Sequence, residues 1–173
     1  FKNEVKGKYI ITSVSFKLSK KAHSLNTSYG AIETELAKKE INKPTLKDVS
    51  EAVIAIRKSK LPDPKKIGNS GSFFKNPVVS KTHFEKIQKK YPEVPSYEIS
   101  DQEIKVPAGW LIEQSGFKGK RFGNYGVHEK QALVLVNYGD ASGDEIYQLA
   151  KKIQASILTN FSISLEIEVN VFL

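Results

Sequence analysis

The spacing of apolar residues changes repeatedly along the chain, and this constrains the fold more than any other feature. Apolar side chains alternate over residues 8–18 and 163–171, which predicts strands, and residues 132–136 form an apolar run typical of a buried strand. Helical spacing or helix-start signals predict helices over residues 29–39, 45–58, 80–91, 108–115 and 142–157. These elements mix without a regular βαβ rhythm, so the predicted fold class is α+β.

A proline-containing segment predicts a division of the chain. Pro62 and Pro64 follow the helix expected over residues 45–58 and cannot continue it. A length of 173 residues fits one domain, or one domain with part of another. We therefore expect a first unit over residues 1–60, with a strand, a loop and a helix, and a second unit over residues 61–173.

The net charge of +8 predicts an anionic partner. Nucleic acid is one candidate, but the lysines are spread along the chain, with no helix-turn-helix, zinc-finger or RNP-like pattern. The same positive charge would equally attract a sugar nucleotide that carries a diphosphate. For these reasons no nucleic-acid partner is expected. No membrane partner is expected either, since no apolar run approaches 18 residues.

Metal and disulfide chemistry find little support in the composition. The chain has no cysteine, which excludes disulfides and thiolate ligands within it. The three histidines, His23, His83 and His128, lack the spacing of metal ligands. No metal is expected, and His128 is expected to satisfy a loop hydrogen bond.

Residues 68–77, GNSGSFFKNP, are the most specific motif. Small residues there let the backbone and a hydroxyl approach a ligand closely, and two phenylalanines anchor what we expect to be a loop. Ser72 lies directly before the phenylalanines. It has no adjacent His or Asp, and the Gly-x-Ser-x-Gly motif is absent, so a hydrolase triad is poorly supported. From the residues alone, a serine that bonds its own turn is the commoner outcome.

These ten residues resemble the serine loop of the UDP-N-acetylmuramate dehydrogenase family, also called UDP-N-acetylenolpyruvoylglucosamine reductase or MurB. Further segments match the family in order: residues 28–30, 60–64, 107–119, 127–137 and 165–169. The family's amino-terminal flavin-binding portion has no counterpart in this sequence. The resemblance therefore implies that residues 1–60 are a remnant of the FAD-binding domain and that residues 61–173 are the carboxy-terminal substrate-binding domain.

The resemblance also implies two catalytic residues. Ser72 corresponds to the family's proton donor, and Glu168 corresponds to the catalytic carboxylate. Without the resemblance, Glu166 and Glu168 would count as ordinary exposed acids of an alternating strand. The family pattern often has Pro between these two acids and Arg after the following Val, where this chain has Ile167 and Asn170. The family's catalytic arginine belongs to the unmatched portion.

The remaining site positions implied by the resemblance bind the substrate. They are Tyr29, Arg57, Lys60, Asn76, Lys118 and Gln131. Arginine and lysine suit an anionic sugar nucleotide, while the two amides supply neutral hydrogen bonds. Tyr29 resembles the tyrosine of the family subtype that folds a loop over the substrate as a lid.

The function implied is that of a cytoplasmic, monomeric flavoprotein of peptidoglycan precursor synthesis. It would use NADPH and FAD to reduce UDP-N-acetylglucosamine enolpyruvate to UDP-N-acetylmuramate. The chain has no Gly-x-Gly-x-x-Gly motif, so its residues do not independently predict dinucleotide binding. The chain alone is expected to be colourless and inactive. Two alternatives stay open: a non-catalytic sugar-nucleotide-binding module and a basic nucleic-acid-binding domain.

Overall fold

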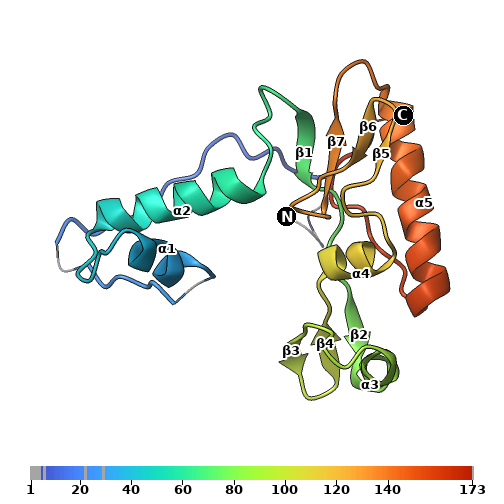
Figure 1. The fold of residues 1–173 in the computed structure, drawn as a ribbon, viewed down its shortest axis with the longest axis horizontal. Helices are drawn as coiled ribbons and strands as arrows, with labels where there is room; N and C mark the ends of the chain where they lie inside the picture. Colours follow the sequence, from blue (N-terminus) through green and yellow to red (C-terminus); the bar gives the residue numbers. More distant parts are fainter. Residues whose placement is uncertain (1–4, 6, 22, 29, 173) are drawn as a thin grey trace. The chain divides into compact units, whose positions relative to one another are not determined.

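The computed structural model describes residues 5, 7–21, 23–28 and 30–172. The chain divides into two compact units, Phe1–Ile56 and Arg57–Leu173, which are described separately below. Helices and two antiparallel sheets occur together in the described part, as Figure 1 shows, so the predicted α+β class is confirmed.

The first unit is built on two helices. They are α1 (Ile32–Lys38) and α2 (Leu46–Lys60), the second of which continues into the second unit. Their apolar faces form a small core around Ile32, Leu36 and Ala52. Both helices were predicted, because amphipathic spacing and start signals are local properties of the sequence.

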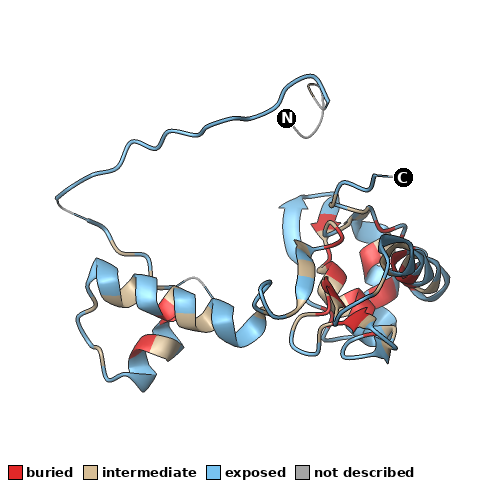
Figure 2. Ribbon diagram, turned by 90° about the horizontal axis from the view of Figure 1, so that it is seen from above, coloured by how far each residue is buried: buried red, intermediate tan, exposed pale blue. Residues whose placement is uncertain are grey.

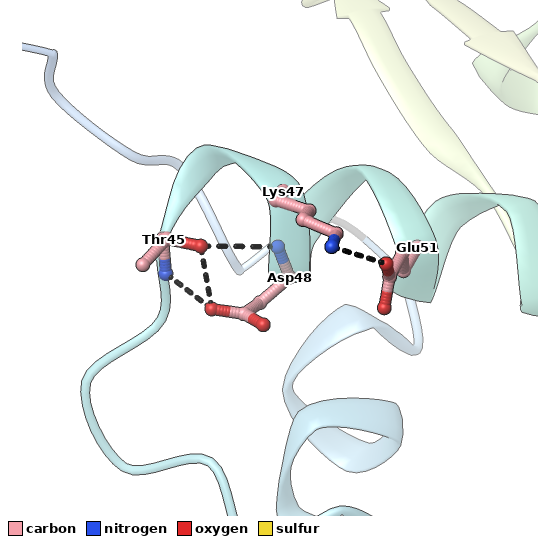
Figure 3. Close-up of polar contacts among 4 residues, drawn as sticks. All are labelled: Thr45, Lys47, Asp48 and Glu51. Carbon is pink, nitrogen blue, oxygen red and sulfur yellow. Dashed lines mark hydrogen bonds and ion pairs between the residues drawn. The ribbon is translucent and has the colours of Figure 1, made fainter.

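A reciprocal cap starts α2, as Figure 3 shows. The Asp48 amide donates to Thr45 Oγ1 at 3.3 Å, and the Asp48 carboxylate accepts from the Thr45 amide at 2.7 Å and from its hydroxyl at 2.6 Å. These bonds from Thr45 lower the pKa of Asp48 below its ordinary value because they stabilise the ionised form. The predicted helix start at Thr45 is confirmed.

The strand predicted over residues 8–18 is wrong. Residues 9–19 have no regular secondary structure, and every described residue from 7 to 21 is exposed, as the pale blue trace in Figure 2 shows. Ile10 is 91% exposed and Leu18 is 82% exposed. A strand needs a neighbouring strand for its backbone hydrogen bonds, and none of the described segments supplies one. Apolar alternation by itself could not reveal this.

The second unit contains a four-stranded antiparallel sheet with the order β1-β7-β6-β5. Its strands are β1 (Gly68–Ser72), β7 (Val134–Asn137), β6 (Tyr125–Val127) and β5 (Arg121–Phe122). The long helix α5 (Gly143–Phe161) packs on β6 and β7. Strand β7 confirms the predicted buried strand, shifted toward the carboxyl end. Three glycines and several basic residues predict a loop over residues 118–126, but most of this segment forms the β5–β6 hairpin, so that prediction is wrong.

The second sheet of this unit is small and was not predicted. It has the order β2-β4-β3, with β2 (Val78–Ser80), β4 (Glu103–Lys105) and β3 (Tyr97–Ser100). Helix α3 (Lys81–Lys90) follows β2 and packs on this sheet. Ser80 caps α3 as predicted, because its hydroxyl accepts the His83 amide at 3.2 Å.

Helices α5 and α4 (Ala108–Gln114) pack against the core of this unit. Ser142 and Glu145 form a full capping box at the start of α5, and Ile153 and Ile157 on the same helix are completely buried. Helix α4 is also present as predicted, and Pro107 is its N-cap. None of the helices in the described part is long and apolar enough to cross a membrane.

Candidate active site

The segment with the predicted proton donor is a bulged edge strand. Ser72 is the last residue of β1 and pairs with Val134, and the register shifts between Asn69 and Ser72. Gly71 has φ +73°, a left-handed conformation that favours glycine. The Asn69 side chain supports this turn, because its Oδ1 accepts the Gly71 amide at 3.1 Å. The predicted loop is therefore a short strand interrupted by a bulge.

Two phenylalanines fix this segment to the core. Phe73 is 5% exposed and Phe74 is 1% exposed, with ring centroids 5.3 Å apart. The Phe73 amide also donates to the Leu133 carbonyl at 2.8 Å. Ser72 itself is exposed. A surface hydroxyl is thus joined directly to a rigid, buried anchor, which confirms the anchoring role predicted for the phenylalanines.

The segment with the predicted carboxylate pairs directly with the segment after Ser72. The Glu168 amide donates to the Phe73 carbonyl at 2.9 Å, and the Lys75 amide donates to the Glu166 carbonyl at 2.9 Å. Between these bonds, Phe74 and Ile167 form one isolated antiparallel bridge. Residues distant in sequence, Ser72 and Glu168, therefore lie on adjoining backbone segments. Glu168 is exposed, like Ser72.

The strand expected over residues 163–171 is reduced to that single bridge. Its alternation is retained in burial, since Ile163 and Leu165 are buried whereas Ser164 and Glu166 are exposed. The partner segment is short because Pro77, which has no amide hydrogen, soon follows. Neither bridge hydrogen bond uses the amide of Ile167. That position can accordingly accept the proline of the family pattern without losing either bond.

Sequence reasoning missed an ion pair at this junction. The Lys75 ammonium contacts the Glu166 carboxylate, with the two side chains 33% and 63% exposed. Lys75 lies within the serine motif and Glu166 was noted only as a neighbour of Glu168. No local signal could have joined them, because their contact depends on the pairing of distant segments.

Three of the predicted substrate-binding residues gather around α4. Asn76 Oδ1 accepts the Ala108 amide at 2.8 Å, and Lys118 Nζ donates to Glu113 at 2.8 Å. Gln131 Oε1 accepts the Leu133 amide at 3.3 Å and also lies close to Gly109 of α4. The amide oxygens of Asn76 and Gln131 are thus already used within the chain. Their NH₂ groups are the parts suited to meeting an anionic or sugar oxygen.

The structure does not bring the other predicted substrate-binding residues into contact with the Ser72 segment. Arg57 and Lys60 lie in the last turn of α2. No hydrogen bond or ion pair joins either cation to the Ser72 segment within the described part of the chain. Tyr29 lies outside the described residues.

His128 has a structural contact of its own. Its Nδ1 accepts the Lys130 amide at 3.3 Å, which confirms the expected loop hydrogen bond. Burial lowers the pKa of His128, with Glu129 acting in the opposite direction and Lys130 in the same direction. Among the residues that the structure describes, no three His, Asp or Glu side chains are grouped to hold a metal ion.

A cavity of about 570 Å³ lies beside the site. Its wall includes Gly68, Asn69 and Ser70 from β1, the start of α5, and residues 169–172. Two asparagine side chains in this wall form hydrogen bonds within their own loops. Asn69 bonds to Ile67 and Gly71. Asn137 bonds to Gly139 and Ala141. The wall combines apolar side chains with polar ones, among them Ser70, Asp144 and Asn170, while Ser72 and Glu168 lie outside it.

Comparison with known proteins shows the family of the chain. Residues 63–172 match the model of the UDP-N-acetylenolpyruvoylglucosamine reductase, C-terminal domain, and so include both the Ser72 and Glu168 segments. The chain belongs to the UDP-N-acetylenolpyruvoylglucosamine reductase family. The family resemblance of the sequence motifs is thereby confirmed.

Relatives from several bacteria share the similarity over nearly the whole chain. The UDP-N-acetylenolpyruvoylglucosamine reductase of Flavobacterium johnsoniae is 65% identical, over 99% of this chain and 51% of its own length. That of Chromobacterium violaceum is 48% identical, over 97% of this chain and 49% of its own length. The solved MurB of Thermus caldophilus has 25% identity and a TM-score of 0.45, covering 78% of this chain and 35% of that one. The chain thus spans about half the length of the curated relatives it matches.

Proposed function

We propose that the complete protein carrying this chain reduces UDP-N-acetylglucosamine enolpyruvate to UDP-N-acetylmuramate with NADPH. The observation that carries the proposal is the 65% identity, over 99% of the chain, to a protein named UDP-N-acetylenolpyruvoylglucosamine reductase. The reaction would serve peptidoglycan precursor synthesis in the cytoplasm, in a monomeric flavoprotein.

Ser72 is the proton donor in this proposal. The hydride added to one carbon of the enolpyruvyl double bond would come from FAD bound in the complete protein, which NADPH would reduce. The Ser72 hydroxyl donates a proton to the neighbouring carbon, which completes reduction of the double bond, and solvent restores the hydroxyl proton. A hydroxyl on a rigid anchor suits this task because a proton donor must be held within hydrogen-bond reach of the reacting atom.

The backbone beside Ser72 is open on one face. A Cβ added at Gly71 would meet nothing within 4 Å, so this face of the bulge is open. The glycine and serine residues at 68–72 therefore fit close approach of a ligand to the donor hydroxyl. Glu168, on the adjoining segment, would stabilise the enolic intermediate as hydride and proton are added.

Substrate binding is assigned to the cations and amides. Arg57, Lys60 and Lys118 would meet the diphosphate, and Tyr29 would close over it. Lys118 already pairs with Glu113, so an anionic substrate must compete with that carboxylate. The NH₂ groups of Asn76 and Gln131 would donate to phosphate or sugar oxygens, since their amide oxygens are engaged.

The test is an assay of the complete protein with its bound flavin. NADPH consumption should require UDP-N-acetylglucosamine enolpyruvate, and mass spectrometry should identify UDP-N-acetylmuramate as the product. NADPH consumption that is independent of the enolpyruvyl substrate would contradict the proposal. Binding of UDP-sugars without turnover would instead indicate a non-catalytic module. The 173-residue chain alone is expected to lack flavin and activity, which its absorption spectrum would show.

A further inference from the structure

We propose that Lys75 and Glu166 are positioning residues that select which of the two neighbouring acids, Glu166 or Glu168, lies beside the Ser72 segment. The inference rests on the proposed function for its catalytic consequence. Its structural content, the register between residues 73–75 and 166–168, stands on the contacts alone.

The backbone pairing at this junction specifies its register only weakly. It consists of the Phe74–Ile167 bridge and the two flanking hydrogen bonds, Glu168 to Phe73 and Lys75 to Glu166. Such a short ladder could form equally well with the segment displaced by two residues, because every backbone unit offers the same donor and acceptor. The side chains must therefore decide the register.

The apolar pattern does not exclude a displacement by two residues. Side chains in an extended segment repeat every two positions, so a shift of two keeps the same face toward the core. Leu165, Ile167 and Val169 would still alternate with polar residues. The shift would, however, place Glu166 opposite Phe73, in the position that Glu168 occupies. Because the two acids are two residues apart, a shift of two would replace one acid by the other opposite Phe73. A segment with a single acid would not have this ambiguity of register.

The Lys75–Glu166 ion pair removes the ambiguity. In the observed register Lys75 lies opposite Glu166, and their side chains are in contact. In the displaced register Lys75 would lie opposite Ser164, which offers no charge. The ion pair therefore favours the arrangement with Glu168 opposite Phe73, directly after Ser72. Opposite charges that lie directly across from each other on neighbouring antiparallel segments stabilise that pairing.

One contact from α5 acts in the same direction. The Gln154 side chain donates to the Leu165 carbonyl at 2.6 Å and so holds the beginning of the segment. Gln154 thus contacts the segment from α5, whereas Lys75 contacts it from the segment that follows Ser72. Loss of the ion pair is thus expected to loosen the junction without unfolding the unit.

The experiment uses the complete flavin-bound protein with Lys75→Met, Glu166→Gln and the exchanged pair Lys75→Glu/Glu166→Lys. The matched control is Glu51→Gln, which removes the surface pair between Lys47 and Glu51 in the first unit. Stopped-flow absorbance measures flavin reduction by NADPH and flavin reoxidation by the enolpyruvyl substrate separately. Hydrogen exchange of the Glu168 amide, which donates to Phe73, reports the register independently of activity.

Each single variant should slow reoxidation of the flavin by the substrate by about 10- to 100-fold, because even a small displacement of a catalytic group such as the Glu168 carboxylate is sufficient for such a loss. Flavin reduction by NADPH should be unchanged, and hydrogen exchange of the Glu168 amide should accelerate. The charge-swapped double variant should largely restore the parent's reoxidation rate and its slow hydrogen exchange. Parent-like exchange in the single variants, or no recovery in the exchanged pair, would overturn the inference. If exchange responds as expected but the parent does not reduce the substrate, the proposed function fails and the register assignment stands.

Discussion

The sharpest structural prediction concerns Gly126, in the centre of the four-stranded sheet. Gly126 of β6 lies between Arg121 of β5 and Val136 of β7. A Cβ added at this position would lie 2.4 Å from the Lys120 carbonyl oxygen and 3.0 Å from Arg121 Cα. Both atoms belong to the backbone and cannot move by rotating a side chain. Gly126→Ala must therefore displace the β5–β6 hairpin.

The expected cost follows from what must move. Forcing an extra carbon into a packed site typically costs about 1–3 kcal/mol. Relief would also pull the Lys120 carbonyl away from the Val127 amide, which donates to it at 2.9 Å, and the loss of one such bond adds about 1 kcal/mol. We expect Gly126→Ala to lower the free energy of unfolding of the second unit by about 2–4 kcal/mol.

Trp110 provides the assay. It is the only tryptophan, lies in the second unit, and packs against Tyr91 and Phe161 with ring centroids 5.4 and 5.8 Å away. Its fluorescence during urea denaturation therefore reports unfolding of this unit, and linear extrapolation gives the free energy.

Gly143→Ala is the matched control for the same chemical change. Gly143 is the first residue of α5, and a Cβ there would meet nothing within 4 Å. That variant should be neutral, or more stable by about 0.4–1 kcal/mol, because alanine restricts the unfolded chain. An unchanged midpoint for Gly126→Ala, or an equal loss for Gly143→Ala, would refute the reasoning.

Two further predictions concern helix caps. Ser142→Ala should lower the free energy of unfolding by about 0.5–2 kcal/mol in the same urea assay, because it leaves the Glu145 amide without its side-chain partner; a cost within error would contradict the capping box. The lowered pKa of Asp48 means that its stabilising effect is present above the ordinary Asp pKa and is lost as the pH falls through the lower, folded pKa. Carbon NMR should therefore titrate Asp48 below the ordinary Asp range. Thr45→Ala should raise the midpoint toward that range but not fully restore it, because the backbone amide at position 45 still donates to the Asp48 carboxylate; a midpoint that Thr45→Ala leaves in place would contradict the assigned cause.

The helix starts were predictable because their signals are local. Thr45 with Asp48, Ser80 with the His83 amide, and Ser142 with Glu145 each lie within one turn of chain, so residue types at fixed spacing suffice to find them. Amphipathic spacing then gives the buried face of each helix. The α+β class follows from these local elements.

The strands were less predictable, since a strand depends on a partner elsewhere in the chain. Residues 9–19 alternate well but have no neighbour among the described residues. Conversely, the β5–β6 hairpin was hidden by its glycines, and Gly126 is there because a backbone carbonyl approaches it closely.

The candidate site depended on the family resemblance. Residues alone gave an unusual motif around Ser72 but no reason to prefer Glu168 over Glu166. Their relation emerges only when Phe73 pairs with Glu168 and Lys75 pairs with Glu166. Such contacts between distant segments cannot be derived from local spacing, which is why the Lys75–Glu166 pair was missed.

The central claim is that Ser72 donates the proton, and stopped-flow kinetics of Ser72→Ala in the complete flavin-bound protein tests it most directly. Reduction of the flavin by NADPH should be nearly unchanged, because that half-reaction needs no proton on the substrate. Reoxidation by the enolpyruvyl substrate should fall by about 10²–10⁴-fold, and Ser72→Cys should retain more activity because a thiol can also donate. The neighbouring Ser70→Ala is the control and should resemble the parent. A Ser72→Ala protein that reoxidises at the parent rate, or that loses only the NADPH half-reaction, would contradict the account.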